Sequence, residues 1–369
     1  MSDKLWYKVA RKFIKAGRLP IRVSDIIIEI MQTLLTEEQA KFINLLKKRS
    51  YNLEEIKLLT DMNDEKLNNM LNDLMRIGVI SGIRSRSTGV MVYRKTPLLP
   101  GIIEFTLMRG ETDEHAKKLA RLYSKLYDQI VQDTQLNYEQ MVQEFKSGPS
   151  LDRVVPVEEE VKVGDEIVLP LEEISKIVEK YDPIGVTVCY CRHKKDLLNE
   201  PCETTKERRN CFAFGRTAEF LISQGFVEKI SKEETMEIMK KAEDEGLVHK
   251  AFHTNLDIEK EINGICNCCK CCCGTFLLHY TGAVPIMDSS SHLAQIEEDL
   301  CVGCGTCVQN CAAEAIELID TVAVVNVERC IGCGVCAHLC PENAINLART
   351  EMRRVFIPPP KIATNNNLH

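Results

Sequence analysis

The first half of this chain lacks cysteine: none precedes Cys189, although the 369 residues contain 18. The chain also lacks a run of 18 or more apolar residues and a basic-then-apolar start with a cleavage site. We therefore expect no transmembrane segment, no export signal and a cytoplasmic location. Thiols stay reduced in that compartment, where closely spaced cysteines are metal ligands far more often than disulfides.

Phosphate-binding sequences are absent as well. The chain contains no GxGxxG fingerprint and no P-loop. A flavin, nicotinamide or ATP site is therefore not expected, because such glycine-rich loops bring backbone N–H groups close to phosphate. No catalytic triad is recognisable either, so any hydride chemistry is expected to belong to a partner oxidoreductase or redox protein.

Acidic residues are scarce only near the start of the chain. Residues 1–100 carry 18 Lys and Arg against 11 Asp and Glu, a net charge of +7. The remainder carries 29 against 43, a net charge of −14. A basic head without cysteine therefore precedes an acidic, cysteine-rich body.

The clearest pattern lies near the C-terminus, where CVGCGTCVQNC and CIGCGVCAHLCP repeat the spacing CxxCxxCxxxC. Two-residue gaps in a tight, glycine-rich loop let three thiolates bind one face of an iron–sulfur cube, and the fourth must come from elsewhere. Zinc is the alternative for any CxxC pair, but a closed zinc site needs no third cysteine at the same short interval. Between the runs, AIELIDTVAVVNVERC predicts hydrophobic strands.

These two runs resemble two-[4Fe-4S] bacterial-type ferredoxins over about 55 residues. In such ferredoxins the fourth ligand of each cluster belongs to the other run. The resemblance implies two [4Fe-4S] clusters, one bound by Cys301, Cys304, Cys307 and Cys340 and the other by Cys330, Cys333, Cys336 and Cys311.

Four cysteines begin the middle of the chain. The stretch PIGVTVCYCRH predicts a strand in which Thr187, Cys189 and Cys191 share one face. Cys202 and Cys211 follow in polar, turn-rich sequence that can fold back over a cluster. These four cysteines are interpreted as a third set of metal ligands.

The run GICNCCKCCC packs six further cysteines into eight positions. No single metal ion accepts six thiolates, so our hypothesis is that at least four bind another iron–sulfur cluster, or that the run shares a larger, non-cubane centre with the preceding group. The ten middle thiols would suffice for one or two additional clusters, and zinc bound by some of them is the alternative. Arg192, His193 and Lys270 lie among these cysteines and could donate to sulfide, but ordinary solvated side chains are the commoner case. The six are Cys266, Cys268, Cys269, Cys271, Cys272 and Cys273.

Capping signals mark several helices. TEEQAKFINLLKKR and NLEEIKLLTDM begin at Thr36 and Asn52, each with Gln or Glu three residues later, and SKEETMEIMKKAEDEG runs from Ser231 to a stop at Gly246. NDEKLNNMLNDLMRIGVI has helical spacing, and ISGIRSRSTGVMVYRK predicts a two-stranded hairpin. Three helices followed by a hairpin resemble a winged helix-turn-helix domain over about 75 residues.

Charge on this domain favours protein docking or packing over DNA binding. A DNA reader needs positive charge on its third helix, and the exposed face expected here is close to neutral. The hairpin is basic, which suits an acidic protein as well as DNA. The helix residues are Glu65, Lys66, Asn69, Asn72, Asp73 and Arg76, and the hairpin residues are Arg84, Arg86, Arg94 and Lys95.

Two other segments are predicted to be helical. The basic amphipathic stretch KLWYKVARKFIKAGRLPIR could lie on a membrane or a partner, but covering its own domain is commoner. Residues 112–146 predict a connector or a dimer-forming layer. Their apolar positions are Leu5, Trp6, Val9, Phe13 and Ile14 in the first, and Leu119, Tyr123, Leu126, Ile130 and Val131 in the second.

The expected fold class is α+β and multidomain, and the chain resembles multi-cluster iron–sulfur proteins of anaerobic bacteria and archaea. That resemblance implies an electron carrier, or an electron-transfer subunit of an oxidoreductase, that passes single electrons; oligomers are compatible with it. The rivals are a redox-responsive winged-helix transcription regulator and an enzyme whose non-cubane cluster is the active site. The expected segments are a basic helix with a winged-helix domain (1–100), a helical connector (101–180), a Cys-rich α/β iron–sulfur domain (181–285), a two-cluster ferredoxin-like domain (286–350) and a flexible tail (351–369).

Overall fold

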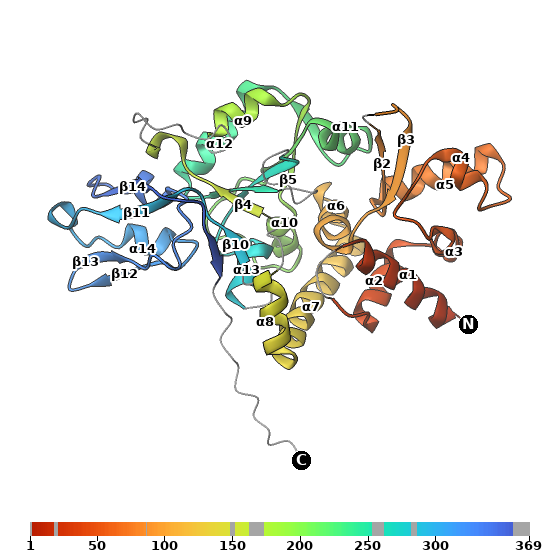
Figure 1. Ribbon diagram of the computed structural model, residues 1–369, viewed down its shortest axis with the longest axis horizontal. Coiled ribbons are helices and arrows are strands. Elements are labelled where there is room, and N and C mark those ends of the chain that lie inside the picture. Colours follow the sequence, from red (N-terminus) through yellow and green to blue (C-terminus); the bar gives the residue numbers. More distant parts are fainter. Residues whose placement is uncertain are drawn as a thin grey trace, which may run out of the picture.

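The computed structural model describes residues 2–17, 21–85, 87–147, 152–161, 173–252, 262–281 and 286–356. Figure 1 shows helices of the N-terminal region at one end, a mixed sheet in the middle and two small strand pairs at the other end. Within the described residues, no helix combines the length and the apolar character that crossing a membrane would require.

The N-terminal region consists of helices and a small antiparallel sheet with the strand order β1-β3-β2. The predicted caps are confirmed, because Thr36 and Asn52 each form a reciprocal capping box with the residue three positions later. The elements are α1 (Ser2–Ala16), α2 (Asp25–Leu34), α3 (Glu37–Leu45), β1 (Ser50–Tyr51), α4 (Leu53–Lys57), α5 (Asp64–Ile77), β2 (Ile80–Arg84) and β3 (Met91–Lys95).

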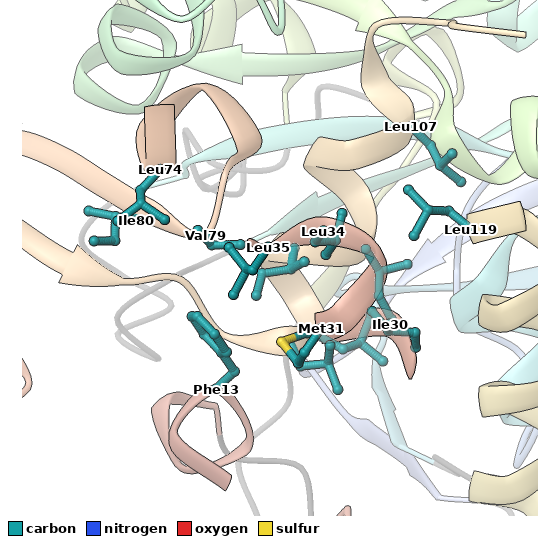
Figure 2. Close-up of a cluster of buried hydrophobic side chains, with 14 of the residues drawn as sticks. Phe13, Ile30, Met31, Leu34, Leu35, Leu74, Val79, Ile80, Leu107 and Leu119 are labelled. Atoms are coloured by element: carbon teal, nitrogen blue, oxygen red, sulfur yellow. The ribbon is translucent and has the colours of Figure 1, made fainter. Parts of the chain in front are cut away.

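Helix α1 covers its own domain, which confirms the commoner of the expected roles for this amphipathic segment. Trp6, Val9 and Phe13 are buried in the core that the helices share. Figure 2 shows Phe13 among the buried side chains of this core, with Met31 of α2, Leu74 of α5 and Ile80 of β2. Burial of a large apolar side chain contributes about 1.5–3 kcal/mol, so this packing fixes the helix against the domain.

The connector consists of a kinked turn at Leu98–Ile102, α6 (Ile103–Met108), α7 (Glu114–Leu136) and α8 (Tyr138–Ser147). The predicted apolar face of α7 is confirmed: Leu119, Tyr123, Leu126 and Ile130 are buried. They belong to the same core as the N-terminal helices and α10, so this face is used within the chain.

The middle of the molecule is an eight-stranded sheet with the order β15-β10-β4-β8-β9-β6-β5-β7. All of its pairs are antiparallel except β10 with β4. The strands are β4 (Asp152–Val155), β5 (Ile184–Val188), β6 (Arg209–Phe214), β7 (Glu228–Ile230), β8 (Val248–Phe252), β9 (Gly264–Cys268), β10 (Ile286–Asp288) and β15 (Arg354–Phe356). The helices are α9 (Ile174–Lys180), α10 (Tyr190–Leu197), α11 (Gly215–Ser223), α12 (Lys232–Asp244) and α13 (Gly274–Tyr280).

Two strand pairs follow near the C-terminus. They are β11 (His292–Ile296) with β14 (Ile345–Arg349), and β12 (Ile316–Ile319) with β13 (Val322–Val325). Two short helices, α14 (Thr306–Asn310) and α15 (Val335–His338), complete this module. The strands predicted between the two cysteine runs are therefore present. Single 3-10 turns lie at Glu158–Glu160 and Glu298–Leu300.

The structure corrects two boundaries. The predicted strand around Cys189 ends at Val188, because Cys189 occupies the N-cap position of α10 and Cys191 lies in the first helical turn. The central sheet also takes strands from outside residues 181–285: β4 comes from the predicted connector, and β10 and β15 flank the last module. The predicted tail (351–369) is wrong at its start, because β15 lies within it; residues 357–369 lie outside the described residues.

Candidate metal centres

The eight C-terminal cysteines line two separate cavities. One is lined by Cys301, Cys304, Cys307 and Cys340, together with apolar side chains such as Leu318. The other is lined by Cys311, Cys330, Cys333 and Cys336, together with Ile316 and Leu347. The structure therefore brings together the two crossed quartets that the ferredoxin resemblance implies.

Backbone geometry suits thiolate ligands in both cavities. The N–H groups of Ala323, Ala344 and Ala315 donate to the Sγ atoms of Cys301, Cys340 and Cys311 at 3.2–3.4 Å. Hydrogen bonds to a thiolate favour its charged form, which is the metal-binding form. The turns depend on glycine: Gly332 has φ +64°, and a Cβ there would lie 2.2 Å from the His292 carbonyl oxygen.

A third cavity lies beside the central sheet and is lined by seven of the ten middle cysteines, of which Cys269 also belongs to the compact group described below. Hydrogen-bonding contacts join the other six thiols in one continuous series. In the order of their contacts, the six are Cys266, Cys211, Cys189, Cys191, Cys273 and Cys268.

Four different elements position these six thiols. Cys266 and Cys268 are two residues apart on β9 and therefore share a face, and Cys211 on β6 is directly opposite Cys266. Cys189 precedes α10, and Cys273 occupies the N-cap position of α13. The cavity therefore lies where two interior strands of the central sheet meet the starts of two helices.

The remaining four cysteines form a compact group. The Sγ atoms of Cys202, Cys269, Cys271 and Cys272 all lie within 4.8 Å of one another. Cys202 is 3.7 Å from Cys269 and 3.6 Å from Cys271, and Cys271 is 3.6 Å from Cys272. Ala242 and Leu247, at and beyond the end of α12, pack against this group, so the helix predicted at Ser231–Gly246 is indeed a scaffold for it.

Comparison with known proteins identifies one part of the chain. Residues 294–347 match the model of the 4Fe-4S dicluster domain family. This module is therefore a ferredoxin-like iron–sulfur domain. Among curated proteins, none matches the chain.

The middle cysteines are not grouped as the sequence suggested. The set Cys189, Cys191, Cys202 and Cys211 is divided, because Cys202 lies with the compact group and the other three line the third cavity. The run of six is divided as well. Cys268 is the last residue of β9 and lines the third cavity, whereas Cys269, the first residue after the strand, borders that cavity and also belongs to the compact group.

Arg192 lies between the third cavity and the compact group. Its side chain is fully buried, and Nη2 donates to the Asn267 carbonyl oxygen at 2.8 Å. Within the described residues, Nε and Nη1 have no hydrogen-bond partner. Burial alone would lower the pKa of Arg192, but the nearby thiols of Cys189 and Cys269 raise it. Two free donors on a buried cation suit an anionic sulfur centre.

The expectation of solvated side chains is therefore wrong for two of the three basic residues. Arg192 is fully buried, and His193 is buried with its Nε2 2.7 Å from the Glu111 carbonyl oxygen. Lys270 is exposed and forms an ion pair with Glu314 at 3.0 Å, as a solvated residue would. The sequence does not distinguish them because all three are basic residues beside cysteines.

The thiols of the third cavity differ in their tendency to ionise. The pKa of Cys189 is well below its ordinary value because Cys191 and Cys211 hydrogen-bond to it. The pKa of Cys273 is likewise lowered by hydrogen bonds from Cys191 and Cys268. The series therefore contains two thiols favoured as thiolates, which are the form that binds metal.

A buried polar series adjoins the third cavity and was not anticipated from the sequence. Asn267 lines the cavity, and its side-chain oxygen lies 2.8 Å from Nδ1 of His249. Nε2 of His249 lies 3.0 Å from Glu243, and Asn267 also donates to Asn210 at 3.1 Å. Because each buried polar group has a partner, the series holds Asn267 and β9 in a fixed position.

The three cavities follow one another through a shared core. Cys307, Cys336 and Cys273 belong to the same buried cluster, which also contains Phe276 of α13. Tyr280, one helical turn further on, is close enough to Cys311 and Cys273 that both raise its pKa, although burial is the main cause. Of the 18 cysteines, Cys304 alone is exposed. The succession therefore begins at the surface near Cys304 and ends in the interior.

Proposed function

We propose that this protein is an electron carrier, or an electron-transfer subunit of an oxidoreductase, in which single electrons pass between a surface site and a buried site. The observation that carries this proposal is the succession of three thiol-lined cavities in one core. Iron–sulfur clusters supply one-electron chemistry when bound, and their potentials span about −700 to +450 mV depending on surroundings. The chain's own thiols would hold them at fixed positions.

The crossed quartets are the proposed ligand sets of two [4Fe-4S] clusters. Cys301, Cys304 and Cys307 would bind one cluster with Cys340 as fourth ligand, and the equivalent three of the second run would bind the other with Cys311. Support comes from the cavity linings and from the backbone donors to Cys301, Cys340 and Cys311.

The six-thiol cavity is the proposed site of a third iron–sulfur cluster. Thiols line it as they line the two ferredoxin-type cavities, and Arg192, which also lines it, has two donor atoms, Nε and Nη1, without a partner among the described residues. Six thiols exceed the four that a cube binds, so either two of them stay unbound or the cluster has more than four thiolate ligands.

The surface around Cys304 is the proposed docking site for a redox partner. Val302, Leu318 and Ile319 are exposed there, and Val302 and Leu318 also line the cavity of the Cys301 quartet. Two acidic residues adjoin them and are exposed: Asp320, which follows Ile319, and Glu342, which also lines this cavity. An apolar patch with an acidic rim fits a partner that presents an apolar centre surrounded by basic residues.

The N-terminal region is proposed to be a winged-helix domain used for packing and docking rather than for DNA. The exposed face of α5 carries both signs of charge, and Lys66 on it forms an ion pair with Glu38. Basic side chains of the hairpin are engaged within the chain: Arg84 Nη1 donates to the Gly89 carbonyl oxygen, and Lys95 donates to the carbonyl oxygens of Leu46 and Lys48. Phosphate contacts need basic groups that are free. The predicted residue Arg86 lies outside the described residues.

Anaerobic reduction of the purified protein tests the proposed function. We expect three distinguishable iron–sulfur signals in electron paramagnetic resonance during a stepwise titration with a low-potential reductant, and about 12 irons per chain. About 8 irons and signals from the ferredoxin-type pair alone would show that the six-thiol cavity holds no cluster. Sequence-specific DNA binding that changes with oxygen exposure would instead support the transcription regulator.

A further inference from the structure

We propose that Cys202, Cys269, Cys271 and Cys272 bind one zinc ion in a closed tetrahedral site that is separate from the iron–sulfur clusters. The separation of the sulfur atoms carries this proposal. A zinc–thiolate bond is about 2.3 Å long, so four thiolates at the corners of a regular tetrahedron lie about 3.8 Å apart. Three of the sulfur–sulfur distances in the group are 3.6, 3.6 and 3.7 Å, and all four sulfur atoms lie within 4.8 Å of one another.

The same chain provides an internal comparison. Within the described residues, no three sulfur atoms of either ferredoxin-type quartet or of the six-thiol series all lie within 4.8 Å of one another, whereas all four of the compact group do. Thiolates around a cube are farther apart because each one binds a different iron. The compact group is therefore too tight for a cube and has the spacing of ligands that share one ion.

Local donors and charges suit four thiolates. The Thr204 hydroxyl lies 3.5 Å from the Sγ atom of Cys271. The charges of Arg192 and Arg208 both interact with Cys202. Four thiolates with one divalent ion carry a net charge of −2. The buried Arg192 offsets part of this charge, whereas Arg208 is already paired with Asp196 through Nε and Nη2 at 2.6 and 2.9 Å.

The site ties together two segments that are distant in sequence. Cys202 lies in the loop after α10, and the other three cysteines lie in the turn between β9 and α13, which a hydrogen bond from the Cys273 N–H to the Cys269 carbonyl oxygen closes. Cys268 and Cys273 flank this turn and line the neighbouring cavity. An ion in the turn would therefore hold both thiols in place.

Zinc fits this fixing role better than a redox-active ion. All four ligands are thiols, and Ala242 and Leu247 pack against them, so the coordination is closed. Closed tetrahedral sites with cysteine ligands are typical of structural zinc, which has no redox chemistry of its own.

Metal analysis of two variants tests the proposal. The full chain is purified anaerobically and dialysed against a chelator, and zinc, iron and sulfide are measured. We expect about one zinc per wild-type chain, near-complete loss of zinc in Cys271→Ser, and unchanged zinc with reduced iron in the control Cys304→Ser. Loss of iron without loss of zinc in Cys271→Ser would overturn the proposal, and so would zinc that the chelator removes from the wild type.

X-ray absorption at the zinc edge of the wild-type protein covers the case in which Cys271→Ser does not fold. We expect four sulfur neighbours at about 2.3 Å and no iron neighbour. A wild-type protein without zinc would overturn the proposal, as would zinc with nitrogen or oxygen ligands. The proposal of three iron–sulfur clusters is tested separately, by the number of iron–sulfur signals. Failure of that proposal can therefore be distinguished from failure of the zinc proposal.

Discussion

Each cysteine of the ferredoxin-type module lines one cavity, so single substitutions report on the proposed ligand sets. Cys340→Ser should damage the cluster bound by Cys301, Cys304 and Cys307, although Cys340 belongs to the other run in sequence. Cys311→Ser should damage the second cluster in the same way. In electron paramagnetic resonance, Cys340→Ser should lose the signal of the cluster bound by Cys301, Cys304 and Cys307, and Cys311→Ser should lose the signal of the other cluster. If each variant instead lost the signal of the cluster bound by its own run, the crossed assignment would be wrong.

Arg192 should raise the reduction potential of the proposed third cluster, because a buried cation stabilises the state with one more electron. A charge-assisted hydrogen bond contributes about 1.5–3 kcal/mol, and 59 mV corresponds to a tenfold change for one electron. Arg192→Met should therefore lower this potential by up to roughly 100 mV. Arg192→Lys keeps the charge and should lower it less, while the other two potentials stay unchanged. Equal shifts in all three would indicate a general structural change.

Glu104 makes stability depend on pH. Its carboxylate accepts a hydrogen bond from the Gly101 N–H at 2.5 Å, and burial raises its pKa to about 7. The folded protein then holds a proton that the unfolded chain releases near its ordinary pKa, so stability falls as pH rises from about 5 to 8. The loss is up to about 3 kcal/mol.

The thermal unfolding midpoint of anaerobic protein measures this effect. The wild-type midpoint should fall between pH 5 and pH 8, and Glu104→Gln should remove most of that fall because glutamine does not titrate. The control Glu114→Gln changes an exposed carboxylate and should behave as the wild type. A Glu104→Gln midpoint that falls as steeply as the wild type would show that another group is responsible.

At the scale of elements, the cluster-binding turns require glycine for two reasons: the left-handed φ angle and the close approach of another backbone. Two glycines of this chain separate these reasons. Gly332 and Gly89 have similar left-handed φ angles, +64° and +67°. A Cβ at Gly332 would lie 2.2 Å from a backbone oxygen, whereas one at Gly89 would have no neighbour within 4 Å. Gly89→Ala should therefore cost only the left-handed strain, about 1 kcal/mol.

Gly332→Ala should cost more, because the backbone of β11 must move and with it the turn that holds Cys330 and Cys333. We expect this variant to lose iron from one cluster, and Gly89→Ala to keep the full iron content. Similar iron contents and similar thermal unfolding midpoints in both variants would contradict this prediction. They would show that the backbone at His292 moves away from the new Cβ at little cost.

Short-range patterns explain which elements could be predicted. The caps at Thr36, Asn52 and Ser231 depend on residues three positions apart, and the structure confirms all three. The end of β5 could not be predicted, because alternation continues through Cys191 while the chain turns into α10 after Val188. A helix cap can be predicted because it depends on nearby residues, whereas the end of β5 depends on the packing of α10 against α6 and α7.

At the scale of the whole molecule, the metal-binding sites also differ in whether the local sequence predicts them. The two C-terminal quartets follow from a spacing within each run and a family resemblance. The compact group does not, since Cys202 and Cys269 are 67 positions apart and no motif joins them. The burial of Arg192 also depends on the distant segments that cover it, so the sequence alone favours the wrong interpretation of a solvated side chain.

The ferredoxin-like domain is held at both ends by one sheet. Strand β10 enters it and β15 leaves it, and the two pair antiparallel from Ile286 with Phe356 to Asp288 with Arg354. Ser289 and Arg353 continue this pairing through backbone hydrogen bonding. The domain is thus an insertion between adjacent strands and not an appendage on a linker.

An inserted domain cannot swing between donor and acceptor as a tethered carrier does. Electron exchange between its clusters and the six-thiol site would then occur across fixed gaps and would need no diffusive search. Its rate within the chain should be insensitive to solvent viscosity, whereas exchange with the external partner at Cys304 should slow as viscosity rises.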